Sequence, residues 1–208
     1  GLKNLRINKK KFIYLISPKI INNTFYDNLK LVLKSRKVSF FQLRLKNYSQ
    51  NKKIIIGKQI KNICKKNKVK FIVNDDPLLA RKLNADGCHL GQKDMKIETA
   101  KKILGRKIVG ITCHNSISLA KKAIKAKATY VAFGAFYNSK TKKTKYKADI
   151  KILNKFKKFS KTPIVAIGGI NSDNYKNLLL NNANFLAISG YIWKNKKYKP
   201  LQAIKRLQ

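Results

Sequence analysis

The stretch FIVNDDPLLARKLNADGCHLG, residues 71–91, indicates how this chain folds. It starts with an apolar, strand-like run (71–75), and Asp76 before Pro77 is typical of a helix start. After the turn sequence NADG, which contains Asp86, a second strand-like run follows (87–91). A strand, a helix and a strand in this order predict one unit of a parallel sheet.

The same alternation runs along the whole chain. The predicted strands are 12–17, 38–45, 71–75, 87–91, 108–114, 130–136, 163–169 and 185–190. Helical spacing of apolar residues is seen at 23–37, 52–68, 97–105, 117–127, 172–182 and 199–208. Eight such strands predict an α/β protein with a single (β/α)8 TIM barrel over residues 1–208. A doubly wound open sheet is the alternative, but it usually has five or six strands.

Composition fits one globular protein. The chain has 208 residues, 44% of them hydrophobic, which is enough for a core. No apolar run approaches the roughly 18 residues that would span a membrane. The N-terminal stretch GLKNLRINKKKFIYLIS is basic and then briefly apolar, like a signal peptide, but no small-residue cleavage site follows. We interpret it as leading into the first strand of a cytoplasmic protein.

Lysine and arginine dominate the charged residues, with 49 of them against 8 acidic residues and a formal charge of +41. The basic residues lie in nearly every predicted helix and loop rather than in one stripe, which indicates a compositional bias of exposed positions. The resulting field attracts anions such as phosphorylated metabolites. It also permits weak nucleic-acid binding, but the chain has no recognition motif, so we expect no specific nucleic-acid partner.

The three cysteines (Cys64, Cys88 and Cys113) are an odd number without a CxxC pair, which suits a reducing compartment. Two of them precede histidines, as Cys88-His89 and Cys113-His114. Neighbouring side chains on a strand point to opposite faces, so each pair could offer only one ligand to a shared zinc ion. A structural zinc site needs four ligands, and buried thiols are therefore the favoured reading.

Four of the eight acidic residues lie within residues 71–95, and two of these fall where strands of a barrel end. Asp75 ends the third predicted strand and Asp94 follows the fourth. Active sites of such barrels lie at the carboxyl ends of the strands, and Mg²⁺ is often bound by one or two carboxylates plus substrate phosphates. We expect Asp75 and Asp94 to bind Mg²⁺, whereas Asp76 caps a helix and Asp86 belongs to a turn.

Polar residues follow most of the other strands as well. Arg44, Lys46 and Lys142 stand where they could bind the phosphates that the metal holds. The glycines of VAIGGINSDN (165–174) and AISGYI (187–192) follow strands seven and eight, which is the usual phosphate-binding position of these barrels. Asn171 or Ser172 is expected to cap the helix after Gly168-Gly169.

These residues stand in motifs that resemble the thiamine-phosphate synthases, a superfamily that also includes the thiazole tautomerases. The motifs are QLRLK (42–46), VND (73–75), NADGCHLGQKDM (84–95), VGITCHN (109–115), YVAFGAFYNSKTK (130–142) and PIVAIGGIN (163–171). The resemblance extends from Tyr14 to Trp193. It implies a reaction that joins 4-amino-5-hydroxymethyl-2-methylpyrimidine diphosphate to a thiazole phosphate, through a pyrimidinylmethyl cation formed as diphosphate leaves.

The resemblance also implies roles for single residues. Mg²⁺ would lie on Asp75 and Asp94 and hold the diphosphate. The diphosphate oxygens would be bound by Arg44, Lys46, Asn74 and Lys142. Gln42 would lie by the pyrimidine, and Thr112 takes the position of a serine in the family's fifth-strand motif. The thiazole phosphate would be bound by Ser139, Thr141 and the backbone at Gly169 and Ser189-Gly190.

Three positions depart from the family pattern: Leu45 replaces an acid, Asn138-Ser139 replaces Pro-Thr, and Gly190 replaces a common serine. They leave the diphosphate half unchanged and affect the thiazole-phosphate half. A tautomerase that uses His114 as acid and base is the closest alternative. An inactive, basic nucleic-acid-binding protein is the alternative from another class. The oligomeric state is left open, a homo-oligomer included.

Overall fold

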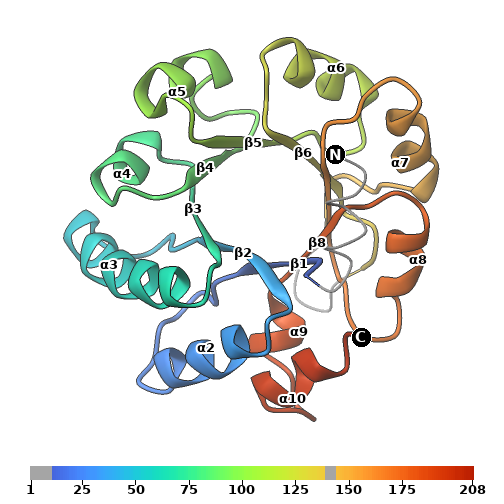
Figure 1. Ribbon diagram of the computed structural model, residues 1–208. Coiled ribbons are helices and arrows are strands. Elements are labelled where there is room, and N and C mark those ends of the chain that lie inside the picture. The colour runs from blue at the N-terminus through green and yellow to red at the C-terminus, as the bar shows by residue number, and fades with distance from the viewer. Residues whose placement is uncertain (1–10, 139–143) are drawn as a thin grey trace.

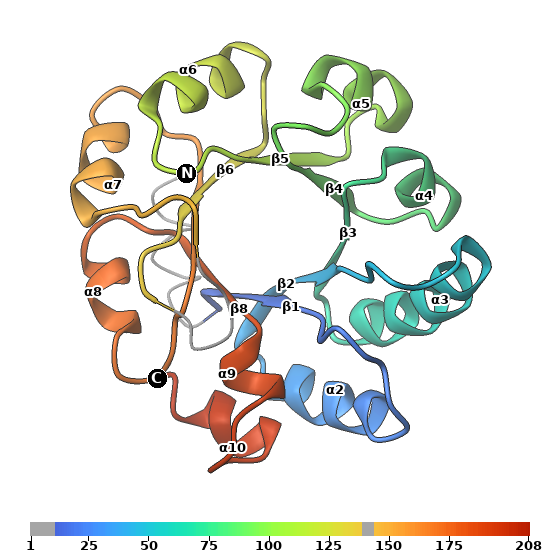
Figure 2. The ribbon, with the colours of Figure 1, turned by 180° about the vertical axis from the view of Figure 1, so that it is seen from behind.

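The computed structural model describes residues 11–138 and 144–208, whose eight parallel strands form one closed barrel in sequence order. Figure 1 shows the strands as a central ring with the helices outside it, and Figure 2 shows the same arrangement from behind. The strands are β1 (Ile13–Ile16), β2 (Val38–Leu43), β3 (Lys70–Asn74), β4 (Gly87–Leu90), β5 (Ile108–Thr112), β6 (Tyr130–Gly134), β7 (Ile164–Ile167) and β8 (Phe185–Ile188). Pairing of β1 with β8 closes the ring, so the TIM-barrel prediction is confirmed and the open sheet is wrong.

Helices cover the outside of the barrel between successive strands. They are α2 (Phe25–Lys34), α3 (Gln50–Lys66), α4 (Pro77–Lys82), α5 (Ile97–Leu104), α6 (Ile117–Lys125), α7 (Ile150–Lys157), α8 (Tyr175–Leu180), α9 (Gly190–Trp193) and α10 (Pro200–Lys205). Asp76 caps α4 by accepting a hydrogen bond from the Leu79 amide at 3.0 Å, as predicted. No helix in the described ranges is long and apolar enough to cross a membrane.

Several predicted boundaries were wrong. Every predicted strand runs one or two residues too far at its carboxyl end, as with 38–45, which ends at Leu43. The chain leaves the sheet at these ends and turns over the barrel's rim. Two helices were missed: α7 follows the capping residue Asp149, whose carboxylate accepts from the Lys151 amide at 2.8 Å, and α9 has only four residues, too few for a periodic pattern.

The apolar residues form two layers on the two faces of the sheet. One layer fills the barrel and contains Tyr14, Tyr130 and Val165 among others. The other lies between the strands and the helices and includes Leu15 and Cys88. Alternation along a strand explains the division, since Tyr14 faces inward and its neighbour Leu15 outward.

Candidate active site

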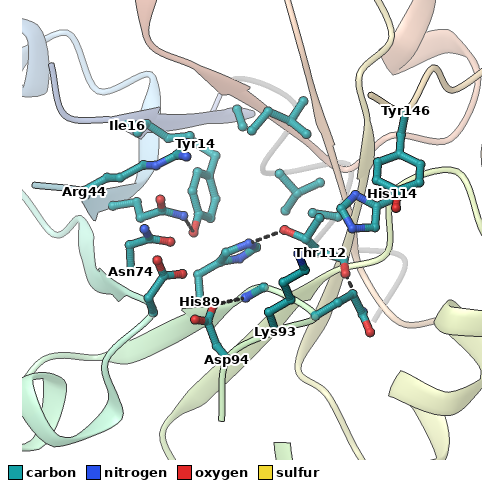
Figure 3. Close-up of a pocket in the computed structure, with 18 of the residues that line it drawn as sticks. Tyr14, Ile16, Arg44, Asn74, His89, Lys93, Asp94, Thr112, His114 and Tyr146 are labelled. Atoms are coloured by element: carbon teal, nitrogen blue, oxygen red, sulfur yellow. Dashed lines mark hydrogen bonds between the residues drawn. The ribbon is translucent and has the colours of Figure 1, made fainter. Parts of the chain in front are cut away.

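The carboxyl ends of the strands surround a cavity of about 540 Å³. Figure 3 shows side chains from opposite sides of the barrel pointing into it. Its lining residues are Tyr14, Ile16, Gln42, Arg44, Lys46, Asn74, Asp75, His89, Gly91, Gln92, Lys93, Asp94, Thr112, His114, Leu119, Ala132, Lys145, Tyr146, Val165, Ile167 and Ala187. The cavity therefore lies where barrel enzymes have their active sites.

Asp75 and Asp94 meet at one side of this cavity, close enough for a hydrogen bond between their carboxyl groups. Asp75 has a φ of 68°, and its amide donates to the His89 carbonyl at 2.7 Å. The Asp94 Oδ2 accepts from the Gly91 amide at 2.7 Å. Partial removal from water, and then the proximity of Asp94, raise the pKa of Asp75 to about 6. Two carboxylates held together this way favour a bound cation.

Positive side chains stand next to this acidic pair. Charges on Arg44 and Lys46 act against the rise in the pKa of Asp75, which shows that both are near its carboxylate. The Arg44 backbone is attached to the end of β1, because its amide donates to Ser17 Oγ at 2.8 Å and its carbonyl accepts from the same hydroxyl at 3.3 Å. Lys93 also lines the cavity. The site thus combines a candidate cation position with several groups that bind anions.

A row of polar side chains crosses the floor of the cavity. His89 Nδ1 is hydrogen-bonded to the Tyr130 hydroxyl and His89 Nε2 to the Thr112 hydroxyl, both at 2.7 Å. Tyr130 contacts the Tyr14 hydroxyl at 2.6 Å, and Gln42 Nε2 donates to Tyr14 at 3.0 Å. Burial, with Arg44 nearby, lowers the pKa of His89 to about 4, so its imidazole is neutral at pH 7.

His114 and Tyr146 form the rim on the opposite side from the aspartates. Their rings stack with centroids 4.0 Å apart, and Figure 3 shows the pair side by side. Partial burial and the nearby Lys145 lower the pKa of His114. Asn115 donates to the Lys147 carbonyl at 3.0 Å, so the loop after β5 is joined to the segment before α7.

The structure brings seven of the predicted site residues to one cavity: Gln42, Arg44, Lys46, Asn74, Asp75, Asp94 and Thr112. Gly169, Ser189 and Gly190 follow β7 and β8 at the same end of the barrel but are not part of its lining. Ser139, Thr141 and Lys142 lie outside the described residues.

The glycine pair after β7 forms a tight turn against the loop after β6. Gly169 has a φ of 63°, and a Cβ there would come within 2.7 Å of the Tyr137 carbonyl oxygen. The predicted caps of the next helix were wrong, since α8 starts after Asn174 rather than after Asn171 or Ser172. Asn171 instead accepts from the Asp173 amide at 2.8 Å, inside the loop. The Asn171 side chain therefore stabilises the loop and does not cap the helix.

Sequence reasoning missed the inward-facing Tyr14 and Tyr130, whose aromatic side chains looked like ordinary core residues. The signal was available in Gly110: a Cβ there would lie 2.0 Å from the Tyr130 ring, so the neighbouring strand leaves room for that ring. The predicted alternation at the Cys-His pair is confirmed, because Cys88 belongs to the outer apolar layer and His89 faces the cavity.

A closed parallel barrel with paired carboxylates and cationic side chains at its carboxyl rim defines an enzyme of the TIM-barrel class that acts on phosphorylated substrates. The family model described as thiamine monophosphate synthase matches residues 13–192. The chain belongs to this family.

Individual relatives are similar over almost the whole chain. A thiamine-phosphate synthase of Pelagibacter ubique is 66% identical over 208 residues, covering 100% of both chains. One of Erythrobacter litoralis is 40% identical over 197 residues and 92% of each chain. Among solved structures, thiamine phosphate pyrophosphorylase from Pyrococcus furiosus has a TM-score of 0.84 and 26% identity, over 97% of this chain and 95% of that one.

Proposed function

We propose that this chain is a thiamine-phosphate synthase that joins a pyrimidine diphosphate to a thiazole phosphate and releases diphosphate. The observation that carries the proposal is the meeting of Asp75 and Asp94 beside Arg44 and Lys46 at one cavity. A site that promotes the departure of diphosphate needs such neutralising groups more than it needs a strong base.

The donor set fits magnesium. Asp75 and Asp94 would hold the ion. Partial burial, and then the neighbouring Asp94, raise the pKa of Asp75, and a bound cation would offset both effects. Within residues 11–138 and 144–208, no group of three or more His, Cys, Asp or Glu residues could hold a metal. Mg²⁺ suits two carboxylates, since it takes its other ligands from water and phosphate oxygens. When bound, it would neutralise charge on the diphosphate.

The chain's own residues bind and orient the pyrimidine diphosphate. Arg44, Lys46, Asn74 and Lys142 bind diphosphate oxygens, whereas Gln42 and Thr112 contact the pyrimidine ring. The opposite wall is apolar and offers no nucleophile at Ala132, Val165, Ile167 or Ala187. A pyrimidinylmethyl cation formed between the two walls is then left for the thiazole nitrogen.

The thiazole phosphate is bound by Ser139, Thr141 and the backbone at Gly169 and Ser189-Gly190. Support for this half comes from the resemblance and from space at the rim, since a Cβ on Gly190 would meet nothing within 4 Å. The three free cysteines are buried, which suits a reducing compartment, and we place the reaction in the cytoplasm.

The experiment is an assay of diphosphate release with each substrate alone and with both, with and without Mg²⁺. We expect release to be fast only with both substrates and the metal, with an equal amount of thiamine phosphate formed. Conversion of a thiazole tautomer without formation of thiamine phosphate would instead support the tautomerase that uses His114.

A further inference from the structure

The polar row on the cavity floor is a continuous chain of four hydrogen bonds that crosses the barrel. It runs from Gln42 on β2 through Tyr14, Tyr130 and His89 to Thr112 on β5, with heavy-atom distances of 3.0, 2.6, 2.7 and 2.7 Å. Figure 3 shows the His89 ring between the Tyr14 phenol and Thr112. Both ends line the cavity, whereas Tyr130 in the middle does not.

All hydrogen bonds in this hydrogen-bond chain run in one donor-to-acceptor direction, because each inner residue has a single hydrogen to donate. Gln42 Nε2 donates to the Tyr14 oxygen, and the Tyr14 hydrogen then has only the Tyr130 oxygen as an acceptor among the described residues. Tyr130 in turn donates to His89 Nδ1. A neutral imidazole that accepts at Nδ1 carries its proton on Nε2, and it donates this proton to Thr112.

The direction of the chain decides what each end offers to a ligand. The Thr112 oxygen already accepts from His89, so its own hydrogen is left for the cavity. At the other end, Gln42 Oε1 has no hydrogen-bond donor among the described residues. Since no buried side-chain oxygen there lacks a partner, this oxygen is open to the cavity that Gln42 lines. The floor therefore presents one acceptor and one donor.

We propose that Tyr14, Tyr130 and His89 are positioning residues that fix the hydrogen-bonding polarity of Gln42 and Thr112. They thereby select an amino-substituted nitrogen heterocycle and reject its oxo counterpart. An amino group donates to Gln42 and a bare ring nitrogen accepts from Thr112, whereas an oxo group with an adjacent N–H has the opposite pattern. The inference rests on the proposed function and identifies how its pyrimidine is chosen.

Packing holds the residues of the hydrogen-bond chain rigid, as selection between the amino and oxo heterocycles requires. The Tyr130 ring fills the space left by Gly110 and stacks on His89 with centroids 5.6 Å apart at 20°. Tyr14 stacks on Phe40 with centroids 5.3 Å apart. Since the rings cannot turn away, reversal of one hydrogen bond requires reversal of all of them.

The test compares the 4-amino pyrimidine diphosphate with its 4-oxo analogue in wild type and in Tyr130→Phe. A site that hydrogen-bonds its substrate discriminates by about 10⁴-fold, and we expect a kcat/KM ratio of that order in wild type. Tyr130→Phe keeps the ring but breaks the chain, so the ratio should fall at least about tenfold. A ratio within about twofold of wild type would overturn the proposal.

Tyr175→Phe is the matched control. Tyr175 is also buried, and its hydroxyl accepts from the Gln208 amide and donates to the Gln208 carbonyl, both at 2.9 Å, away from the cavity. Its loss should lower thermal stability as Tyr130→Phe does but leave the ratio unchanged. A changed ratio in this control would mean that loss of a buried hydroxyl is enough, and would overturn the proposal.

A double mutant shows whether Tyr14 and Tyr130 act through one connected hydrogen-bond chain or through independent contacts. Tyr14→Phe should lower the ratio as Tyr130→Phe does, and it serves alone if the latter does not fold. The double variant should lower the ratio no further, because the chain is already broken, whereas additive losses would contradict it. Calorimetric binding of the two diphosphates repeats the comparison without turnover. If wild type forms no thiamine phosphate but binds the amino ligand more tightly than the oxo ligand, the proposed function is wrong. The proposed role of the hydrogen-bond chain is then still supported.

Discussion

The two sides of the cavity are built on different principles. On the side of β2 to β4, charged side chains face the cavity, with Arg44, Lys46, Asp75 and Asp94 forming what we term the charged wall. On the side of β6 to β8, Ala132, Val165, Ile167 and Ala187 form an apolar wall of small and branched residues. Under the proposed reaction, the charged wall binds the leaving group, and the apolar wall surrounds the reactive carbon without a group that would capture it.

The contrast teaches that a net charge of +41 does not by itself make the site. Most lysines are on exposed positions all around the barrel, where they are solvated. The charged wall differs because it places cations beside two carboxylates, in a cavity that restricts water. A substitution on one side of the cavity should therefore change the function of that side and leave the other side's function unaffected.

Asp94→Asn should have the largest effect. The amide can still accept the hydrogen bond from Gly91, so the loop is retained, but the pair of charges that would hold the metal is broken. We expect kcat to fall by about 10²–10³-fold, with a higher Mg²⁺ concentration for half-maximal rate. The matched control is Asp173→Asn, an exposed acid after β7. An unchanged rate across a Mg²⁺ titration would remove Asp94 from the metal site.

Arg44→Met should come next. Methionine retains much of the side chain's apolar volume while the charge is lost, and a charge-assisted hydrogen bond contributes about 1.5–3 kcal/mol. Steady-state kinetics should show kcat/KM for the pyrimidine diphosphate falling about 10–100-fold. Arg81→Met, on the exposed side of α4, makes the same change of net charge. Equal losses in both variants would mean that the overall field, rather than the charged wall, attracts the substrate.

Gly190→Ala examines the backbone on the opposite side. A Cβ there meets nothing within 4 Å, so the thermal midpoint should stay unchanged. If this backbone binds the thiazole phosphate as proposed, a methyl group there should raise the KM for that substrate several-fold, about 1 kcal/mol, and leave the KM for the pyrimidine diphosphate unaltered. If neither KM changes, the phosphate is bound elsewhere.

The smallest expected effect is that of Asp75→Asn on the thermal stability of the metal-free protein. The pKa of Asp75 is about 6 in the folded chain against an ordinary 3.8, so wild type loses stability as the pH rises from about 4 to about 6. Asparagine tolerates the φ of 68° and removes the like charge. At pH 7 the melting temperature should rise by about 2–4 °C, or about 1 kcal/mol after screening by water.

Calorimetry across this pH range checks the sign. The difference in melting temperature between Asp75→Asn and wild type should be small at pH 4 and grow toward pH 6.5. Mg²⁺ should stabilise wild type and leave the variant unchanged. A variant less stable than wild type at every pH would show that the carboxylate supports the fold.

Local pattern was enough to predict the barrel and most of the rim. Buried parallel strands must be apolar on both faces, so eight such runs separated by amphipathic helices predict the closed ring, and polar residues at their ends predict Asp75, Asp94 and Arg44. Exact strand ends were not predictable, because the residue at which a chain leaves the sheet depends on contacts such as that of Ser17 with Arg44. The same holds for Asn171, which the loop uses in place of the helix.

The fold class, the family and the neighbouring acids Asp75 and Asp94 could be inferred before any coordinates, because these depend on spacing along single strands and on motifs that are contiguous in the chain. The hydrogen bonds that link Gln42, Tyr14, Tyr130, His89 and Thr112 become apparent only in the folded barrel. Those residues come from five strands as far apart as β1 and β6. An inward-facing tyrosine has the same local pattern whether it fills space or donates a hydrogen bond, and the partner is set by closure of the barrel.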